Sequence, residues 1–293
     1  MNIIDGRLIA QKIYKQLQNE ITSINFKPKL GIILASNDEA SRMYVKKMKI
    51  KKALALGIDT ELKVFTEDVI IDDVLKEIQF FNKDKSINGI LVQVPFYSHL
   101  EKERNTILNA INPTKDADGL SALNLGLTSQ LTNEGLPPAT VDAIIECIKY
   151  TINQQEVREE IFNEFLTSKQ ILIINNTTLI GKPLALILST YNATVTISNK
   201  FTKNLKELCL SADIIISATN QTNIIDYSMI KKNAILIDVT SNKVGEKVIG
   251  DIVLSDKLIE KTGWLTPVPG GVGPVTIACL MRNVIRLGKL QQL

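Results

Sequence analysis

The chain has 293 residues, of which 45% are hydrophobic and 22% are charged, and its formal net charge at pH 7 is +3. This length is sufficient for two α/β domains, and so small and dispersed a charge does not indicate a nucleic-acid-binding protein. No hydrophobic run is long enough to span a membrane, and residues 1–7 lack the basic and apolar segments of a signal peptide. We therefore expect a cytoplasmic protein with no nucleic-acid or membrane partner.

Three cysteines and one histidine narrow the possible chemistry. Cys147, Cys209 and Cys279 are far apart in apolar, helix-like segments, which predicts buried, reduced thiols rather than disulfides or metal ligands. His99 lies in an expected loop, and a catalytic triad or a multi-histidine metal site would depend on it alone. We expect His99 to have no catalytic role and the chain to bind no metal.

Helical and strand patterns alternate in the first half of the chain. Apolar residues at helical spacing predict helices, and short apolar runs predict buried strands. The expected order is a helix carrying Ile9, Ile13 and Leu17, a strand at 29–35, a helix at 39–56, a strand at 60–65, a helix at 74–81 and a strand at 89–95. Such alternation predicts a parallel sheet covered on both faces, with ligands bound beyond the carboxyl ends of its strands.

Polar groups in this region have ordinary structural interpretations when each is taken alone. Gln93 interrupts the apolar strand at 89–95, and its amide needs hydrogen-bond partners if it is buried. Lys115-Asp116-Ala117-Asp118-Gly119 places two acids before a glycine, a pattern typical of a solvated turn. The helix at 39–56 carries a basic face formed by Lys46, Lys47, Lys49, Lys51 and Lys52.

The second half of the chain has the pattern of a dinucleotide-binding domain. Buried strands are expected at 171–174, 192–196, 212–218 and 235–242. The first is followed by Asn175-Asn176-Thr177-Thr178-Leu179-Ile180-Gly181-Lys182-Pro183, a turn that leads into a helix. The backbone N–H groups of such a turn, together with the helix N-terminus, can hold the phosphates of a nucleotide.

Residues 266–276, Thr-Pro-Val-Pro-Gly-Gly-Val-Gly-Pro-Val-Thr, contain three prolines and three glycines. Such a segment cannot form the interior of a helix or strand, and its glycines let the backbone approach a flat partner closely. Pro274 is suited to begin a C-terminal helix. A tight connector into that helix is the simplest interpretation of the segment.

Taken in order, these motifs resemble those of the bifunctional methylenetetrahydrofolate dehydrogenase/cyclohydrolase (FolD-type) family. The most specific are the 266–276 segment, Ile90-Leu91-Val92-Gln93-x-Pro95 and Asp116-x-Asp118-Gly119, and the resemblance covers nearly the whole chain. It implies two α/β domains flanking a cleft, the second a Rossmann-like dinucleotide-binding domain. Residues 1–141 would form the folate-binding catalytic domain, with a C-terminal helix at 274–293 packing back on it, and residues 142–273 the NADP-binding domain.

The resemblance also implies roles for residues of the first domain. In the family a tyrosine, here Tyr44, stacks on the folate ring, and a lysine four residues later acts as general acid/base. Gln93 would contact that lysine, and Asp118 would bind the pterin ring by accepting two parallel N–H bonds. The substrate site would be completed by Pro267, Gly270, Gly271 and Pro274.

One position departs from this pattern, because the residue four after Tyr44 is Met48. Counting back from Gly57 instead makes Lys49 the catalytic lysine, with one extra residue between it and Tyr44. On a regular helix, residues five apart point roughly 140° apart, whereas a π-bulge would absorb the extra residue and restore the pairing. Lys49 is therefore the expected catalytic residue, and Lys47, three residues after Tyr44, is the alternative.

The implied cofactor is NADP. The residues expected to contact it are Asn175, Asn176, Thr177, Gly181, Lys182, Pro183, Lys200, Thr202 and Thr240. Lys200 can supply positive charge for the 2′-phosphate. Three glycines of the family pattern are replaced in this chain, by Asn175, Asn220 and Thr240, and a β-carbon at a close-approach glycine can block a ligand.

The implied activity belongs to one-carbon metabolism. It is the NADP-dependent oxidation of 5,10-methylenetetrahydrofolate to 5,10-methenyltetrahydrofolate, followed by hydrolysis to 10-formyltetrahydrofolate. Two alternatives remain open: the replaced glycines favour a cyclohydrolase with a degraded cofactor site, and Met48 at the usual lysine position favours a non-catalytic folate-binding protein. Tetrahydrofolate derivatives are the expected partners, and the resemblance also implies a homodimer.

Overall fold

The structure is a computed structural model that describes residues 1–130, 135–152, 157–245 and 247–292. Its contacts divide the chain into two compact units, a three-stranded unit of residues 12–139 and 277–293 and a six-stranded unit of residues 1–11 and 140–276. Leu293, the last residue of the expected C-terminal helix, lies outside the described residues. Residues 1–11 thus group with the second half of the chain, while the functional domain boundaries after residues 141 and 273 stay a prediction.

The three-stranded unit is built on a parallel sheet with the strand order β3-β2-β4. The strands are β2 (Lys29–Leu34), β3 (Asp59–Val64) and β4 (Gly89–Gln93). Every residue of β4 and nearly every residue of β2 is buried, as expected of strands covered on both faces. The predicted strands and their parallel arrangement are confirmed, and the register pairs Gln93 with Leu34 at the carboxyl end of the sheet.

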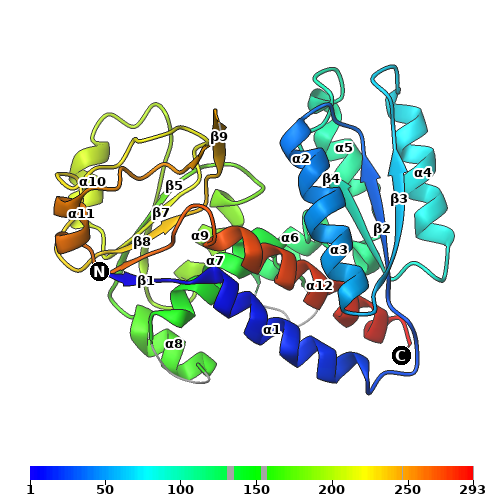
Figure 1. Ribbon diagram of the computed structural model, residues 1–293, viewed down its shortest axis with the longest axis horizontal. Coiled ribbons are helices and arrows are strands. Elements are labelled where there is room, and N and C mark those ends of the chain that lie inside the picture. The colour runs from blue at the N-terminus through cyan, green and yellow to red at the C-terminus, as the bar shows by residue number, and fades with distance from the viewer. Residues whose placement is uncertain (131–134, 153–156, 246, 293) are drawn as a thin grey trace. The chain divides into compact units, whose positions relative to one another are not determined.

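Helices flank this sheet, with α2 and α3 on one side and α4 on the other in Figure 1. α4 (Ile71–Lys83) buries Val74, Ile78 and Phe81, which share one helical face. The other helical segments are α1 (Gly6–Ile21), α2 (Glu39–Met43), a π-helix (Tyr44–Lys49), α3 (Ile50–Ala55), α5 (Arg104–Asn109), α6 (Ala122–Ser129), α12 (Val272–Leu290) and 3-10 turns at Glu101–Glu103 and Pro113–Lys115.

The C-terminal helix that was expected to begin at Pro274 begins two residues earlier, at Val272. Proline is tolerated there because the first four N–H groups of a helix have no intrahelical acceptor. Both α1 and α12 start in the six-stranded unit and continue into the three-stranded unit. The two units therefore share continuous helices rather than being joined by loops alone.

The six-stranded unit contains a parallel sheet with the order β1-β11-β8-β7-β5-β6. The strands are β1 (Asn2–Ile3), β5 (Gln170–Ile174), β6 (Thr194–Ser198), β7 (Ile214–Ser217), β8 (Ile235–Asp238) and β11 (Trp264–Leu265). The four strands predicted from apolar runs are confirmed, with ends that differ by a few residues. The chain runs from β5 outward in both directions, and ligands of such sheets bind at the point where the strand order reverses.

Helices and one hairpin complete this unit. The helices are α7 (Ala139–Tyr150), α8 (Glu159–Leu166), α9 (Gly181–Ser189), α10 (Leu205–Ser211) and α11 (Asp256–Lys261), and the antiparallel hairpin is formed by β9 (Asn242–Val244) and β10 (Lys247–Ile249). Cys209 of α10 and Leu258 of α11 pack in a core with Leu172, Ile215 and Leu236 of the sheet.

Two expectations from composition can be compared with the structure. All three cysteines are free and buried, as predicted. Within the described ranges, no helix combines the length and the apolar character needed to cross a membrane.

Candidate active site

A π-helix at Tyr44–Lys49 separates α2 from α3 in the helix that was expected at 39–56. Hydrogen bonds of a π-helix join residues five apart rather than four, so the residue five after Tyr44 returns to the same side. Lys49 Nζ lies 5.3 Å from the centroid of the Tyr44 ring. The predicted π-bulge is confirmed, and it pairs Tyr44 with Lys49 despite the extra residue.

Lys49 is buried, with 5% of its surface exposed. Its Nζ donates a 2.8 Å hydrogen bond to Gln93 Oε1. Desolvation of the ammonium lowers the pKa of Lys49, and the carboxylate of Asp118 opposes part of this shift. Lys47 is exposed, so the structure brings Lys49 rather than Lys47 to Gln93 and Tyr44.

Gln93 is oriented by the backbone at the end of β4. Its Nε2 donates to the carbonyl oxygen of Val94 at 2.5 Å, which leaves Oε1 to accept from Lys49. The contact expected between Gln93 and the lysine is therefore present. Its catalytic importance stays a prediction.

Asp118 is carried by a turn that a neighbouring acid stabilises. Asp116 accepts hydrogen bonds from the N–H groups of Gly119 and Ser121, at 3.0 and 2.7 Å, and from Asn124 Nδ2 at 3.1 Å. This role of Asp116 was not predicted from the sequence, although an acid three residues before a turn glycine is a recognisable signal. Burial raises the pKa of Asp118, with the Lys49 ammonium acting against the shift.

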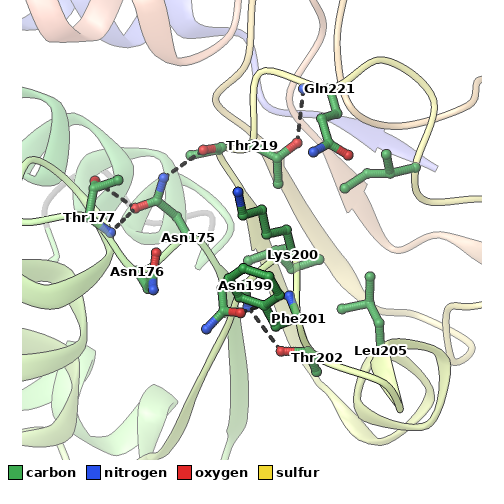
Figure 2. A pocket seen from close by; sticks show the side chains of 13 residues that line it. Asn175, Asn176, Thr177, Asn199, Lys200, Phe201, Thr202, Leu205, Thr219 and Gln221 are labelled. Carbon is green, nitrogen blue, oxygen red and sulfur yellow. Dashed lines mark hydrogen bonds between the residues drawn. The ribbon is translucent and has the colours of Figure 1, made fainter.

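A second candidate site lies in the six-stranded unit, at the carboxyl ends of β5, β6 and β7 (Figure 2). It is a cavity of about 640 Å³ at the reversal point of the strand order. The lining residues are Ile174, Asn175, Asn176, Thr177, Asn199, Lys200, Phe201, Thr202, Leu205, Ala218, Thr219, Gln221 and Ile224. The cavity lies where a nucleotide binds in sheets of this kind.

Five residues predicted to contact the cofactor line this cavity, namely Asn175, Asn176, Thr177, Lys200 and Thr202. The other four predicted cofactor residues are not among the described residues that line the cavity, namely Gly181, Lys182, Pro183 and Thr240. The remaining lining residues were not predicted, and most of them follow the end of β6 or β7: Ile174, Asn199, Phe201, Leu205, Ala218, Thr219, Gln221 and Ile224. Their position after strand ends is a usable signal, whereas apolar periodicity is not.

Asn175 occupies the start of the turn after β5 and uses its side chain within that turn. Its Oδ1 accepts hydrogen bonds from the N–H groups of Thr177, at 2.9 Å, and Gly181, at 3.0 Å. Gly181 is the first residue of α9, and a β-carbon there would lie 1.9 Å from the carbonyl oxygen of Asn175. The side chain of Asn175 thus satisfies two N–H groups of the turn that leads into α9.

The lining of this cavity fits part of a dinucleotide. Lys200 is an exposed cation whose Nζ lies 5.1 Å from the ring centroid of Phe201. Phe201 is 79% exposed although it lines the cavity, and Ile174 and Leu205 add apolar surface. A cation beside apolar and aromatic surface is suited to a phosphate next to a nucleotide base.

Comparison with known proteins identifies the family of the chain. A family model described as "Tetrahydrofolate dehydrogenase/cyclohydrolase, catalytic domain" matches residues 4–118, and the NAD(P)-binding domain of the same family matches residues 138–292. The chain belongs to the tetrahydrofolate dehydrogenase/cyclohydrolase family. The fold class and the family predicted from the motifs are confirmed.

Relatives in this family span the whole chain. The bifunctional protein FolD of Hydrogenobaculum sp. (strain Y04AAS1) is 34% identical over 291 residues, which is 99% of either protein. The crystal structure of the bifunctional FolD enzyme of Campylobacter jejuni has a TM-score of 0.89 and 32% identity, and each chain covers 100% of the other. The FolD structure of Trypanosoma brucei, complexed with NADP and an inhibitor, has a TM-score of 0.88 and 27% identity, over 98% of this chain and 97% of that one. The chain is a FolD-type bifunctional enzyme with an NAD(P)-binding domain.

The signature segment of the family, residues 266–276 here, is tightly packed inside the six-stranded unit. The hydroxyl of Thr266 accepts a 2.7 Å hydrogen bond from the N–H of Asp238. A β-carbon at Gly6 would lie 1.7 Å from the carbonyl oxygen of Gly271, so α1 begins in direct contact with this segment. The part that Pro267, Gly270, Gly271 and Pro274 play in folate binding stays a prediction.

Proposed function

We propose that this chain oxidises 5,10-methylenetetrahydrofolate to 5,10-methenyltetrahydrofolate with NADP and then hydrolyses the product to 10-formyltetrahydrofolate. The observation that supports this most directly is the buried Lys49, bonded to Gln93 and lying beside Tyr44. Family membership supplies the substrate class and the pair of reactions. Lys49, Tyr44, Gln93 and Asp118 are the proposed catalytic and substrate-binding residues of the three-stranded unit.

Lys49 is the proposed proton carrier of the hydrolytic step. Water attacks the methenyl carbon, and Lys49 accepts the proton that the water loses, because burial lowers the pKa of Lys49 and so increases its neutral fraction. The same amine returns the proton to N5 while the bond from carbon to N5 breaks. The hydroxyl of the adduct releases its remaining proton to solvent as it becomes the carbonyl of the formyl group on N10. Gln93 orients the amine through the 2.8 Å hydrogen bond, and Asp118 binds the pterin ring.

The cavity of the six-stranded unit is the proposed NADP site. When bound, NADP supplies the acceptor for the hydride that leaves the methylene carbon. Lys200 would pair with the 2′-phosphate, and Asn176, Thr177 and Thr202, which line the same cavity, would bind the ribose and phosphates. The exposed charge of Lys200 is the reason to propose NADP rather than NAD.

The test is oxidation of methylenetetrahydrofolate with NADP, followed by the absorbance of NADPH, with NAD run in parallel. We expect turnover with NADP and weaker turnover with NAD. Faster turnover with NAD would remove the proposed role of Lys200. Hydrolysis of methenyltetrahydrofolate is measured separately, because it needs no cofactor.

A cyclohydrolase without dehydrogenase activity is the second candidate. The observation that favours it is the side chain of Asn175, which stands where the family motif has glycine and satisfies two N–H groups of the turn. In that case neither NADP nor NAD would support turnover, while hydrolysis of methenyltetrahydrofolate would continue. The third alternative, a non-catalytic folate-binding protein, was motivated by Met48, and the pairing of Lys49 with Tyr44 removes that motive.

Homodimerisation and a cytoplasmic location are also proposed from the family resemblance. Sedimentation equilibrium of the purified chain distinguishes a dimer from a monomer. A mass equal to that of one chain across the micromolar range would contradict the dimer.

A further inference from the structure

Residues 218–221 form one wall of the proposed cofactor cavity. They follow β7 directly, and Ala218, Thr219 and Gln221 line the cavity. Figure 2 shows Thr219 bonded to Gln221, whose N–H donates to Thr219 Oγ1 at 3.1 Å. Because this wall stands at the reversal point of the strand order, its position shapes the cavity there.

Three side chains from separate parts of the chain hold three consecutive residues of this wall. Asn175 Nδ2 donates a hydrogen bond to Ala218 O at 2.6 Å. Thr219 N and Thr219 Oγ1 each donate to Asp251 Oδ2 at 2.9 Å. Asn220 N donates to Thr240 Oγ1 at 3.2 Å. The three side chains follow β5, β10 and β8, so the wall is fixed from three directions.

Two of these side chains, Asn175 and Thr240, stand where the family motif has glycine. Glycine has no side chain, so neither hydrogen bond can form when glycine is present. We propose that Asn175 and Thr240 are positioning residues that hold the wall at residues 218–220 in the form that binds the cofactor. This inference rests on the proposed dehydrogenase function.

Thr240 is the residue at which positioning of the cavity wall can best be distinguished from obstruction of the cofactor. It is 3% exposed and is not among the residues that line the cavity, so its bulk is directed into the protein rather than toward a ligand. Its hydroxyl meets the N–H of Asn220, whose φ of +56° is a left-handed conformation that asparagine tolerates. Thr240 thus acts on the cavity through Asn220.

The test compares substitutions of Thr240 in the full-length protein. Thr240→Val keeps the shape of the side chain and loses the acceptor, whereas Thr240→Ser keeps the acceptor. We expect the affinity for NADP, measured by calorimetric titration, to fall about threefold to tenfold in T240V, the range that corresponds to one ordinary hydrogen bond. T240S should bind NADP as the unsubstituted protein does. In NADPH assays, T240V should change KM for NADP more than kcat.

The affinity of Thr240→Gly for NADP should change in opposite directions if Thr240 positions the cavity wall and if it obstructs the cofactor. Positioning predicts weaker NADP binding by T240G, whereas removal of an obstruction predicts tighter binding. Tighter or unchanged binding by T240G, or T240S as weak as T240V, would overturn the inference while leaving the proposed function intact. If the unsubstituted protein binds neither NADP nor NAD, the proposed dehydrogenase function and this inference fail together. Thermal unfolding of each variant checks that it is folded. If T240V is unstable, the NADP affinities of T240S and T240G still test the inference.

Discussion

Lys49 differs from its neighbouring lysines in its surroundings rather than in its chemical type. Lys46 and Lys47 are exposed, whereas Lys49 is 5% exposed and bonded to Gln93. Burial disfavours the charged ammonium of Lys49, and the nearby negative charge of Asp118 offsets part of this effect. A lysine with both influences can give and take a proton under conditions in which an exposed lysine stays charged.

Substitution of Lys49 tests this difference. We expect Lys49→Met to abolish hydrolysis of methenyltetrahydrofolate while folate binding persists, because methionine fills the buried space but carries no proton. Lys47→Met, at an exposed position three residues after Tyr44, is the matched control and should retain activity. The measurement is the loss of methenyltetrahydrofolate absorbance. The opposite pattern would mean that Lys47 is the catalytic lysine.

At the scale of the element, the π-helix lets one helix contain an additional residue without moving its functional side chains. The extra residue falls in the segment of Tyr44–Lys49, where Met48 is 42% exposed. α3 then continues with Ala53 buried, as a regular helix in the correct phase. The change in spacing is thus confined to one turn.

Deleting Met48 should convert this turn to an ordinary α-helix. Lys49 would then follow Tyr44 by four residues, and residues four apart share a helix face. We expect the variant to keep cyclohydrolase activity and to melt at the same or a higher temperature. Deleting the exposed Lys51 instead is the control, because it shortens the helix equally but displaces Ala53. Equal loss of activity in the two deletions would contradict a special role for the turn.

The start of α1 depends on a close contact between two glycines. Gly6→Ala would bring a β-carbon to 1.7 Å from Gly271 O, so the backbone must shift, and we expect unfolding to become easier by roughly 1–3 kcal/mol. Gly273→Ala is the control, since a β-carbon there meets nothing within 4 Å and helical alanine is favourable. Chemical denaturation measures both. Similar effects of the two substitutions would show that the contact is adaptable.

Across the two units, the sequence predicted those strands whose burial produces a continuous apolar run. Buried parallel strands are continuous apolar runs, so β2, β4, β5 and β7 were located closely. The two-residue strand β1 has no such pattern, because its pairing is with β11, far along the chain. It could not have been predicted from local residues.

The candidate sites also contain features that the sequence predicts and features that it does not. The pairing of Tyr44 with Lys49 followed from counting residues along a helix, which is local information. The support of Asp118 by Asp116 and of Asn220 by Thr240 depends on hydrogen bonds within or between loops. Loop geometry is set by tertiary contacts, so it leaves little trace in spacing or hydropathy.

The unfolding free energy of the molecule should depend on pH through Asp238. Burial, with the charge of Asp251 nearby, raises the pKa of Asp238 to about 7, above the usual value in an unfolded chain. The folded protein therefore holds a proton that the unfolded chain releases, and stability from this group is present below about pH 4 and lost as pH rises through about 7.

Asp238→Asn removes this titration. The unfolding free energy of the unsubstituted protein, minus that of the variant, should decrease between about pH 4 and pH 7 and become constant at higher pH. Urea denaturation at several pH values measures it. A difference that is the same at every pH would mean that Asp238 has the same pKa in the folded protein and in the unfolded chain.

The pairing of β1 with β11 has a consequence for the order in which a newly made chain can fold. Asn2 pairs with Trp264, and Ile3 pairs with Leu265, so the first strand leaves the ribosome long before its neighbour exists. The three-stranded unit must also wait, because it includes residues 277–293. Neither unit has all of its parts until synthesis is nearly finished.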